Sequence, residues 1–396
     1  MPPLIFRKGL DLKHEVAGIL AENYHSDLIA AIKENDYQYH AGRLTVHLAR
    51  EFGFCYGVDR AVDYAYQARK RFPDRPIVLT GEIIHNPHVN AQLRAQGIRF
   101  LTDPGESIDG LTPEDVVILP AFGITIELLE QLDRRGCTLV DTTCGSVLNV
   151  WKNVRRYTAD GFTSVIHGKY WHEETRATAS QAACGGGHYL VVLDRDEAAV
   201  ACDYIRVGGD PRRFRAQFER ASSSGFDPDR DLQHLGCANQ TTMLSSESLA
   251  IAGMFRDAVR GRYGDGELDA RFRSFDTICS ATQDRQDAVA ALLAQWPLDL
   301  MIVIGGYNSS NTCNLARISE PRVPTFHIAE PGGLMSPSEI RHKPVGDKDE
   351  RVSVGWLPTS GRVSVGLTSG ASTPDNLVGT VIGRLDAFVN VVNPGK

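Results

Sequence analysis

The stretch 138–144 reads Thr-Leu-Val-Asp-Thr-Thr-Cys, a short β-like run that ends in a cysteine and leads into an amphipathic helical pattern. The same order occurs twice more, because Cys55 follows Phe-Gly-Phe at 52–54 and Cys279 follows Asp-Thr-Ile at 276–278. These cysteines are separated by about the length of a structural unit, not by the few residues that separate the ligands of a local metal-binding motif. The pattern predicts one thiol per unit and suggests a soft-metal site assembled between units.

Strand-like and helical patterns alternate along the chain from Leu44 to Val389. The expected strands include 163–167, 300–304 and the run 273–278 that leads to the last of these cysteines. Strands that alternate with helices indicate βαβ units and parallel sheets. Together with the repeated strand–cysteine–helix order, the alternation predicts an α/β fold of three similar lobes, each a parallel sheet flanked by helices.

Four segments are expected along the chain. They are a polar helical extension at 1–43 and three α/β lobes at 44–144, 145–278 and 279–396. The second and third lobes each contain a polar stretch, at 207–235 and 331–355, whose glycine, proline and charged residues indicate a surface insertion.

Composition excludes several classes of protein. A net charge of −7 at pH 7 argues against a nucleic-acid binder, whose surface is normally basic. No apolar run has the length needed to span a bilayer, and residues 1–15 lack the apolar core of a secretory signal. Eight cysteines in 396 residues are too sparse for a disulfide scaffold. We therefore expect a cytoplasmic protein without a membrane span.

The spacing of the cysteines bears on the kind of metal. Zinc sites usually pair their ligands in CxxC or HxxxH spacings, and neither occurs in this sequence. Three thiolates without a fourth fit an iron–sulfur cluster with one iron left open, while isolated buried thiols are the alternative for each cysteine. The remaining cysteines lack the strand–cysteine–helix context and are predicted not to be ligands; they are Cys137, Cys184, Cys202, Cys237 and Cys313.

Polar loops follow several of the predicted strands, which is where open parallel sheets bind their ligands. The loops 308–311, Asn-Ser-Ser-Asn, and 368–372, Thr-Ser-Gly-Ala-Ser, precede helices whose N–H groups can hold phosphate oxygens. His85, His172 and the run 240–242, Gln-Thr-Thr, end other strands. Such donors fit a doubly anionic group such as a diphosphate, although helix capping is the alternative for any single loop.

The densest group of ionisable residues is 167–175, His-Gly-Lys-Tyr-Trp-His-Glu-Glu-Thr. Glu174 is a candidate to deliver protons to a bound ligand, and the alternative is an ordinary acid at a helix N-terminus. The sequence contains no GxGxxG or Walker-type phosphate loop, so a nucleotide site is not expected.

Taken together, these motifs resemble the 4-hydroxy-3-methylbut-2-enyl diphosphate reductase (IspH/LytB) family, in family order from about residue 44 to 390. The stretches that carry the resemblance are Phe-Gly-Phe-Cys-Tyr-Gly-Val-Asp-Arg-Ala at 52–61, Glu-Ile-Ile-His-Asn at 82–86, Pro-Ala-Phe-Gly at 120–123, the run 167–175, Asn-Gln-Thr-Thr at 239–242, Gly-Tyr-Asn-Ser-Ser-Asn at 306–311 and Gly-Ala-Ser-Thr-Pro-Asp at 370–375. The N-terminal extension and Pro-Ala-Phe-Gly resemble the long plastid and cyanobacterial form.

The resemblance implies a pseudo-threefold trefoil around one 4Fe–4S cluster per chain, held by Cys55, Cys144 and Cys279 with one open iron for the substrate's hydroxymethyl oxygen. It implies reductive dehydroxylation of (E)-4-hydroxy-3-methylbut-2-enyl diphosphate to isopentenyl and dimethylallyl diphosphate, the last step of the methylerythritol phosphate (non-mevalonate) route to isoprenoids. Reduced ferredoxin or flavodoxin would supply the electrons.

The resemblance also implies roles for single residues. Glu174 and Thr241 match catalytic positions near the substrate hydroxyl, with Glu174 as the proton source. The implied substrate-binding residues are His85, His172, Thr241, Ser309, Ser310, Asn311 and Ser372.

Two positions depart from the family pattern. Phe122 stands where short bacterial members carry a histidine, which removes one diphosphate donor, and Cys313 stands where a serine is expected. Two alternatives to the enzyme remain open at this point: an iron–sulfur sensor that binds a diphosphate without turnover, and a cluster-free α/β protein with structural thiols. Glu174 favours the enzyme, because binding alone needs no proton donor.

Overall fold

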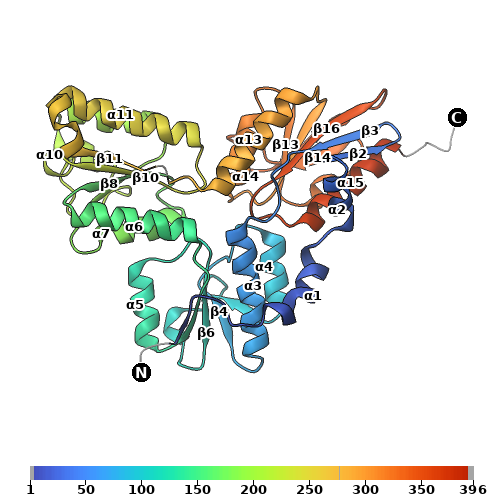
Figure 1. The fold of residues 1–396 in the computed structure, drawn as a ribbon, viewed down its shortest axis with the longest axis horizontal. Helices are drawn as coiled ribbons and strands as arrows, with labels where there is room; N and C mark the ends of the chain where they lie inside the picture. Colours follow the sequence, from blue (N-terminus) through green and yellow to red (C-terminus); the bar gives the residue numbers. More distant parts are fainter. Residues whose placement is uncertain (1–3, 276, 391–396) are drawn as a thin grey trace. The chain divides into compact units, whose positions relative to one another are not determined.

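The computed structural model describes residues 4–275 and 277–390 (Figure 1). Asp276, part of the third cysteine motif, lies outside the described residues, as do the ends of the predicted extension and third lobe. The chain divides into two compact units, which we call the first unit, built on Pro104–Cys279, and the second unit, built on Phe6–Asp103 and the chain from Ser280 onward. The four segments predicted from sequence stay a prediction.

The first unit contains a four-stranded sheet in the order β11-β10-β8-β9, with every neighbouring pair parallel. Its strands are β8 (Thr163–His167), β9 (Tyr189–Val192), β10 (Leu235–Asn239) and β11 (Phe272–Ser274). Its main helices are α6 (Gly145–Ala159), α7 (Glu173–Ala183), α8 (Arg195–Val207) and α11 (Ser245–Tyr263).

Helices cover both faces of this sheet (Figure 1). Cys237 of β10 packs in one apolar cluster with Phe255 of α11, whereas the next residue, Ala238, packs in another with Val154 of α6. Successive side chains of a strand point to opposite faces, so α8 and α11 lie on one face and α6 and α7 on the other. Burial on both faces explains why these strands are apolar throughout.

The first unit also holds β6 (Val116–Leu119) and β7 (Thr138–Asp141), which pair in parallel and are joined by α5 (Ile126–Arg135). The stretch 207–235 carries two short helices, α9 (Pro211–Gln217) and α10 (Pro228–Asp231), and buries the aromatic rings of Phe214 and Phe218 in the core.

The second unit contains a five-stranded sheet in the order β13-β12-β16-β3-β2. Its strands are β2 (Gln38–Ala41), β3 (Leu44–Leu48), β12 (Leu300–Ile304), β13 (Thr325–Ile328) and β16 (Val363–Ser369). All neighbours are parallel except the β2–β3 hairpin. Because β3 pairs with β16, early and late parts of the chain complete one sheet.

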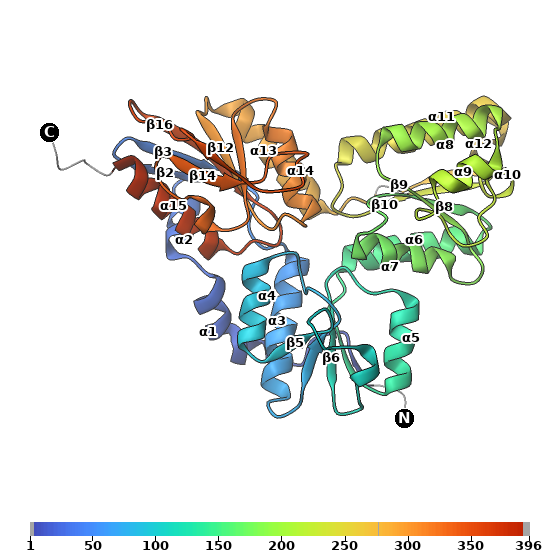
Figure 2. The ribbon, with the colours of Figure 1, turned by 180° about the vertical axis from the view of Figure 1, so that it is seen from behind.

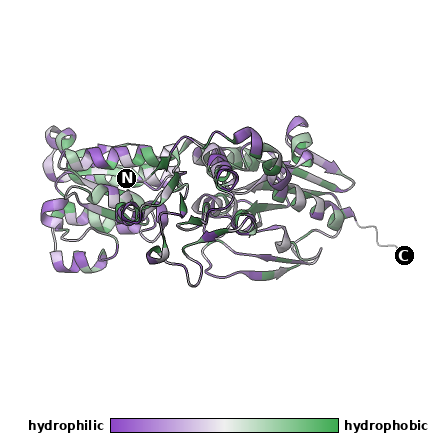
Figure 3. Ribbon diagram, turned by 90° about the horizontal axis from the view of Figure 1, so that it is seen from below, coloured by the Kyte–Doolittle hydropathy of each residue, from purple (hydrophilic) through white to green (hydrophobic). Residues whose placement is uncertain are grey.

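Helices also cover both faces of the second sheet, as Figure 2 shows from behind. Ile302 packs with Ile382 of α15 (Asp375–Asn390), on the face that also receives α2 (Asp27–Glu34). Val303 packs with Leu292 of α13 (Ser280–Gln295) and Leu315 of α14 (Ser310–Ser319) on the other face. Coloured by hydropathy, the ribbon shows both hydrophilic and hydrophobic residues along its helices (Figure 3), as expected where helices bury one side against a sheet.

The rest of the second unit begins with β4 (Ile77–Leu79) and β5 (Ile98–Phe100), a parallel pair accompanied by α1 (Lys13–Tyr24), α3 (Tyr56–Arg71) and α4 (Pro87–Ala95). Helix α1 packs on α3, where the hydroxyls of Tyr24 and Tyr66 lie 2.9 Å apart. The stretch 331–355 forms the antiparallel pair β14 (Glu339–His342) and β15 (Arg351–Val354). The remaining short elements are β1 (Ile5–Phe6), α12 (Leu268–Arg271) and the 3-10 turns η1 (Ile108–Gly110), η2 (Asp265–Glu267) and η3 (Pro331–Gly333).

The predicted alternation of strands and helices is confirmed, and 163–167 and 300–304 are strands as expected. The expected strand at 273–278 is wrong in length, because β11 ends at Ser274. The Asn239 N–H of β10 donates a 2.7 Å hydrogen bond to the Thr277 hydroxyl. A side chain therefore accepts the hydrogen bond that a backbone carbonyl would accept if β11 continued. No helix of the described residues is long and apolar enough to cross a membrane.

Candidate functional site

Each of the three singled-out cysteines lies at the start of a helix. Cys55 is the residue before α3, Cys144 the residue before α6, and Cys279 directly precedes α13. All three side chains are half-buried. A helix N-terminus favours negative charge, which suits a thiolate.

The backbone N–H of each cysteine is tied to one of the motif loops. The N–H of Cys55 donates to the Ala371 carbonyl at 3.1 Å, and the N–H of Cys144 donates to the Ala121 carbonyl at 2.8 Å. The N–H of Cys279 donates to the Thr241 carbonyl at 3.3 Å. Cys55 and Cys279 are thus fixed to loops that sequence analysis assigned to the substrate, and Cys144 to the Pro-Ala-Phe-Gly motif at 120–123.

Three of the other cysteines have different surroundings. Cys202 and Cys237 lie inside the first unit's core, where burial raises the pKa of Cys202 to about 12 and raises that of Cys237 as well. The thiol of Cys137 is also buried and donates to the Thr112 carbonyl at 3.4 Å. Thiols held protonated by burial are poor metal ligands, so Cys202 and Cys237 are unsuited to a cluster, whereas the half-buried Cys55, Cys144 and Cys279 fit one.

The loop before α14 meets the loop after β16 in the second unit. Ser309 caps α14 by accepting a 3.3 Å hydrogen bond from the Thr312 N–H, and Ser310 and Asn311 open the helix as buried residues. The Asn311 Oδ1 accepts a 3.0 Å hydrogen bond from the N–H of Ala371. The amide nitrogen of Asn311 is buried and has no hydrogen-bond partner within the described part of the chain. A buried donor of this kind fits a phosphate oxygen.

His85 belongs to the same group of loops. The Ser372 hydroxyl donates to the His85 carbonyl at 3.3 Å, and the His85 Nδ1 lies 2.8 Å from the Glu82 carboxylate, which fixes the orientation of the ring. The second unit therefore brings together His85, Ser309, Ser310, Asn311 and Ser372, the five predicted diphosphate residues that it contains.

Glycines allow these loops to approach so closely. A Cβ atom on Gly306 would lie 2.4 Å from the His85 carbonyl oxygen, and one on Gly370 would lie 1.9 Å from the Thr312 hydroxyl. Any side chain at either position would push the loops apart. The glycines in the two motifs thus serve the packing of the site.

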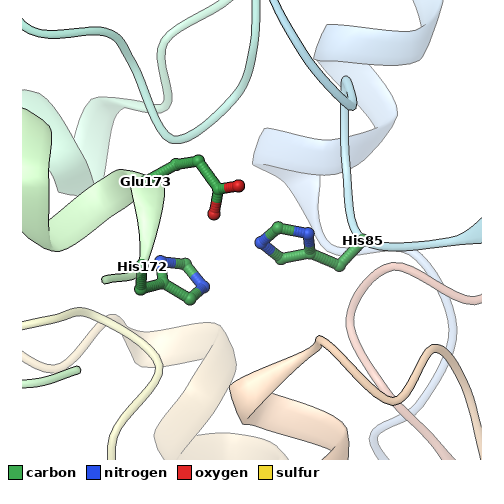
Figure 4. A group of neighbouring side chains, drawn as sticks. All are labelled: His85, His172 and Glu173. Carbon is green, nitrogen blue, oxygen red and sulfur yellow. The ribbon is translucent and has the colours of Figure 1, made fainter. Parts of the chain in front are cut away.

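The first unit holds the predicted catalytic pair. The Glu174 side chain is 3% exposed, and its Oε1 accepts a 2.6 Å hydrogen bond from the Thr241 N–H. The His172 Nδ1 accepts a 3.2 Å hydrogen bond from the Glu174 N–H and so caps α7. Figure 4 shows His172 and Glu173 at this helix start, and His85 on its own loop. The structure therefore places Glu174, Thr241 and His172 together.

Sequence analysis gave Gln240 no role of its own. Its Oε1 accepts hydrogen bonds from the Lys169 N–H at 3.2 Å and from the Thr175 hydroxyl at 3.1 Å. Gln240 therefore ties the loop 167–175 to the run 240–242. Its signal in the sequence was its place between Asn239 and Thr241 at the end of a strand.

The two departures from the family pattern occupy defined positions. The Phe122 ring meets the His172 ring edge-on, with centroids 6.1 Å apart, so it positions that imidazole although it has no donor of its own. The Cys313 thiol lies within α14 and donates to the Tyr307 carbonyl at 3.3 Å.

The comparison with known proteins bears on this arrangement. The family model described as LytB protein matches residues 46–386. The chain belongs to the LytB protein family. It is 50% identical over 398 residues to the 4-hydroxy-3-methylbut-2-enyl diphosphate reductase of Gloeobacter violaceus, covering 98% of this chain and 94% of that one. It is 49% identical over 382 residues to the protein of the same name from Synechococcus sp. strain WH7803, covering 96% and 94%.

Solved structures of LytB relatives match as well. One is described as (E)-4-hydroxy-3-methyl-but-2-enyl diphosphate reductase, the terminal enzyme of the non-mevalonate pathway; it is 27% identical, with a TM-score of 0.51, 86% of this chain and 98% of that chain covered. The reductase of Plasmodium falciparum, 22% identical with a TM-score of 0.61 and 88% of each chain covered, shows the fold alone. The family resemblance and the α/β fold class are confirmed, and so is the expectation of an oxidoreductase.

Proposed function

We propose that this chain is a 4-hydroxy-3-methylbut-2-enyl diphosphate reductase, which forms isopentenyl and dimethylallyl diphosphate in the last step of the methylerythritol phosphate route. The names of its relatives agree with this activity, and none of the relatives cited above is described as a sensor. One observation in this chain's own structure supports the proposed activity. The Thr241 N–H donates to Glu174 and the Thr241 carbonyl accepts from the Cys279 N–H, so the backbone of one residue joins the proposed acid to a proposed cluster ligand.

Cys55, Cys144 and Cys279 hold one 4Fe–4S cluster per chain in this proposal. Its support is the start-of-helix position of all three and the contrast with the buried thiols of Cys202 and Cys237. When bound, such a cluster supplies electrons and, at an iron without a protein ligand, a Lewis acid. Reduced ferredoxin or flavodoxin supplies the electrons, and we place the enzyme in the cytoplasm.

The substrate's diphosphate is bound by hydrogen-bond donors in the proposed site. Asn311 contributes its otherwise unpartnered amide nitrogen, and Ser309 and Ser310 contribute hydroxyls where α14 begins and its N-terminal dipole favours an anion. His85 and His172 add ring N–H groups, and Ser372 completes the set when its one hydroxyl hydrogen turns from the His85 carbonyl to the substrate. Binding of this kind positions the distant hydroxyl of the substrate without taking part in the bond changes.

The reaction needs two electrons and two protons for each substrate. The carbon–oxygen bond breaks, the hydroxyl leaves as water with one of the protons, and a new carbon–hydrogen bond takes the other. Glu174 delivers a proton to the leaving hydroxyl, and the Thr241 N–H holds the carboxyl group in place through the 2.6 Å hydrogen bond. Burial of Glu174 limits competition from bulk water at this step.

The test is an anaerobic assay of the iron-reconstituted protein with the allylic diphosphate and reduced methyl viologen, in which both products are followed. We expect turnover in wild type, and loss of both bound iron and turnover in Cys144→Ser. Cys184→Ser is the matched control, because Cys184 is exposed and outside the proposed ligand set, and it should keep both. An iron-loaded wild type that binds the diphosphate but forms neither product would support the sensor instead.

A further inference from the structure

Helix α6 begins at Cys144 and has two contrasting faces. Val147, Val150, Val154 and Tyr157 are buried toward the sheet of the first unit. On the opposite side lies what we call the α6 face, which consists of the exposed residues Leu148, Lys152, Arg155 and Arg156. Leu148 is 44% exposed and stands one helical turn from the proposed cluster ligand.

The α6 face is positive in a chain whose net charge is −7. The helix carries Lys152, Arg155 and Arg156 and contains no acidic residue. Arg155 hydrogen-bonds to the neutral side chain of Gln181 at 2.7 Å, so its charge is not cancelled. Arg156 lies 3.9 Å from Asp160, an acid that Arg273 also pairs with. More positive than negative charge therefore remains on this surface.

We propose that the α6 face docks the protein that delivers electrons, and that this partner is a small acidic carrier of single electrons. The inference rests on the proposed function, because only a chain that receives electrons needs such a partner. Electron transfer requires the carrier to approach a cluster ligand, and α6 leads from Cys144 to the surface. An apolar residue beside basic side chains is complementary to an acidic protein and speeds its encounter.

The test is charge reversal in the iron-loaded full-length enzyme. In the double variant Lys152→Glu/Arg156→Glu, we expect the KM for reduced ferredoxin to rise about tenfold or more, because reversing exposed charges slows association by about 10-fold to 1,000-fold. Turnover with reduced methyl viologen, a small cation that needs no docking surface, should stay within about twofold of wild type. Added salt should raise the wild-type KM for ferredoxin and affect the variant less.

The matched control is Arg213→Glu/Arg256→Glu, which changes the net charge equally. Both arginines are exposed and belong to α9 and α11, on the side of the first unit's sheet opposite α6. The control should keep the wild-type KM for ferredoxin. Equal KM values in wild type and the α6 variant, or an equal rise in the control, would overturn the docking proposal. Absence of viologen-driven turnover in wild type would instead overturn the proposed function.

Discussion

Replacing Glu174 by glutamine tests the proposed proton donor with little disturbance of the fold. The Glu174 Oε1 accepts a 2.6 Å hydrogen bond from the Thr241 N–H, and a glutamine carbonyl oxygen can accept the same bond. As a proton donor Glu174 carries its proton, so the Thr241 N–H meets a neutral acceptor in both proteins and the strength of this bond changes by less than about 1 kcal/mol. Folding, iron content and substrate binding should therefore change little, whereas the amide has no proton to give the leaving hydroxyl.

The expected loss in kcat is about 100-fold to 10,000-fold, the usual contribution of a positioned acid or base. At about 1.4 kcal/mol for each factor of ten, the loss corresponds to a barrier raised by about 3 to 5 kcal/mol. This effect exceeds the loss in hydrogen-bond strength several times, so chemistry and stability can be separated. The assay is anaerobic turnover with reduced methyl viologen, together with iron content and substrate affinity for each variant.

Glu173→Gln is the matched control, because Glu173 is the neighbouring acid at the same helix start and is exposed. We expect it to turn over at close to the wild-type rate. A kcat for Glu174→Gln within about threefold of wild type would show that the proton comes from another group. A large loss in both variants would point to the electrostatics of the helix start instead.

Two further predictions concern the second unit. Asn311→Asp keeps the acceptor for the Ala371 N–H but replaces the buried donor by a negative charge. The KM for the diphosphate substrate should therefore rise about 10-fold to 100-fold while the iron content stays unchanged. An unchanged KM would show that Asn311 does not bind the substrate. Burial lowers the pKa of His327 to about 4, below its ordinary value of about 6.5. Between these two values the unfolded chain binds a proton that the buried ring does not, so the free energy of unfolding is highest above pH 6.5 and falls by about 3 kcal/mol as the pH approaches 4. Denaturant unfolding between pH 7 and pH 4 should show this loss in wild type and not in His327→Gln; identical pH dependence in both would contradict it.

Much of the fold could be predicted because its elements are local and strongly periodic. The strands 163–167 and 300–304 are apolar runs between turns, and Asn86 with Pro87 marks the start of α4, where the Asn86 side chain accepts the Val89 N–H at 3.2 Å. β2 could not be found in this way. Its four residues, Gln38–Ala41, form no apolar run, and the strand forms because its backbone pairs with β3 at the edge of the sheet.

In the candidate site too, some features could be predicted from the sequence and others could not. Side chains with a chemical purpose, such as Glu174 and Asn311, could be singled out from their types and their loops. The contacts that hold them could not, because the N–H of Thr241 and the N–H of Ala371 are main-chain donors that every non-proline residue possesses. Only the folded chain shows which of these common groups meets which side chain.

Phe122 shows how one departure from the family pattern can be understood physically. A phenyl ring donates no hydrogen bond, so under the proposed function this position contributes nothing direct to diphosphate binding. Its edge-on contact with the His172 ring, at 6.1 Å, still restricts the orientation of an imidazole that also caps α7. Binding then depends more heavily on the remaining donors, above all on the buried amide nitrogen of Asn311. Restoring histidine at position 122 should accordingly help substrate binding less than removing the Asn311 donor harms it.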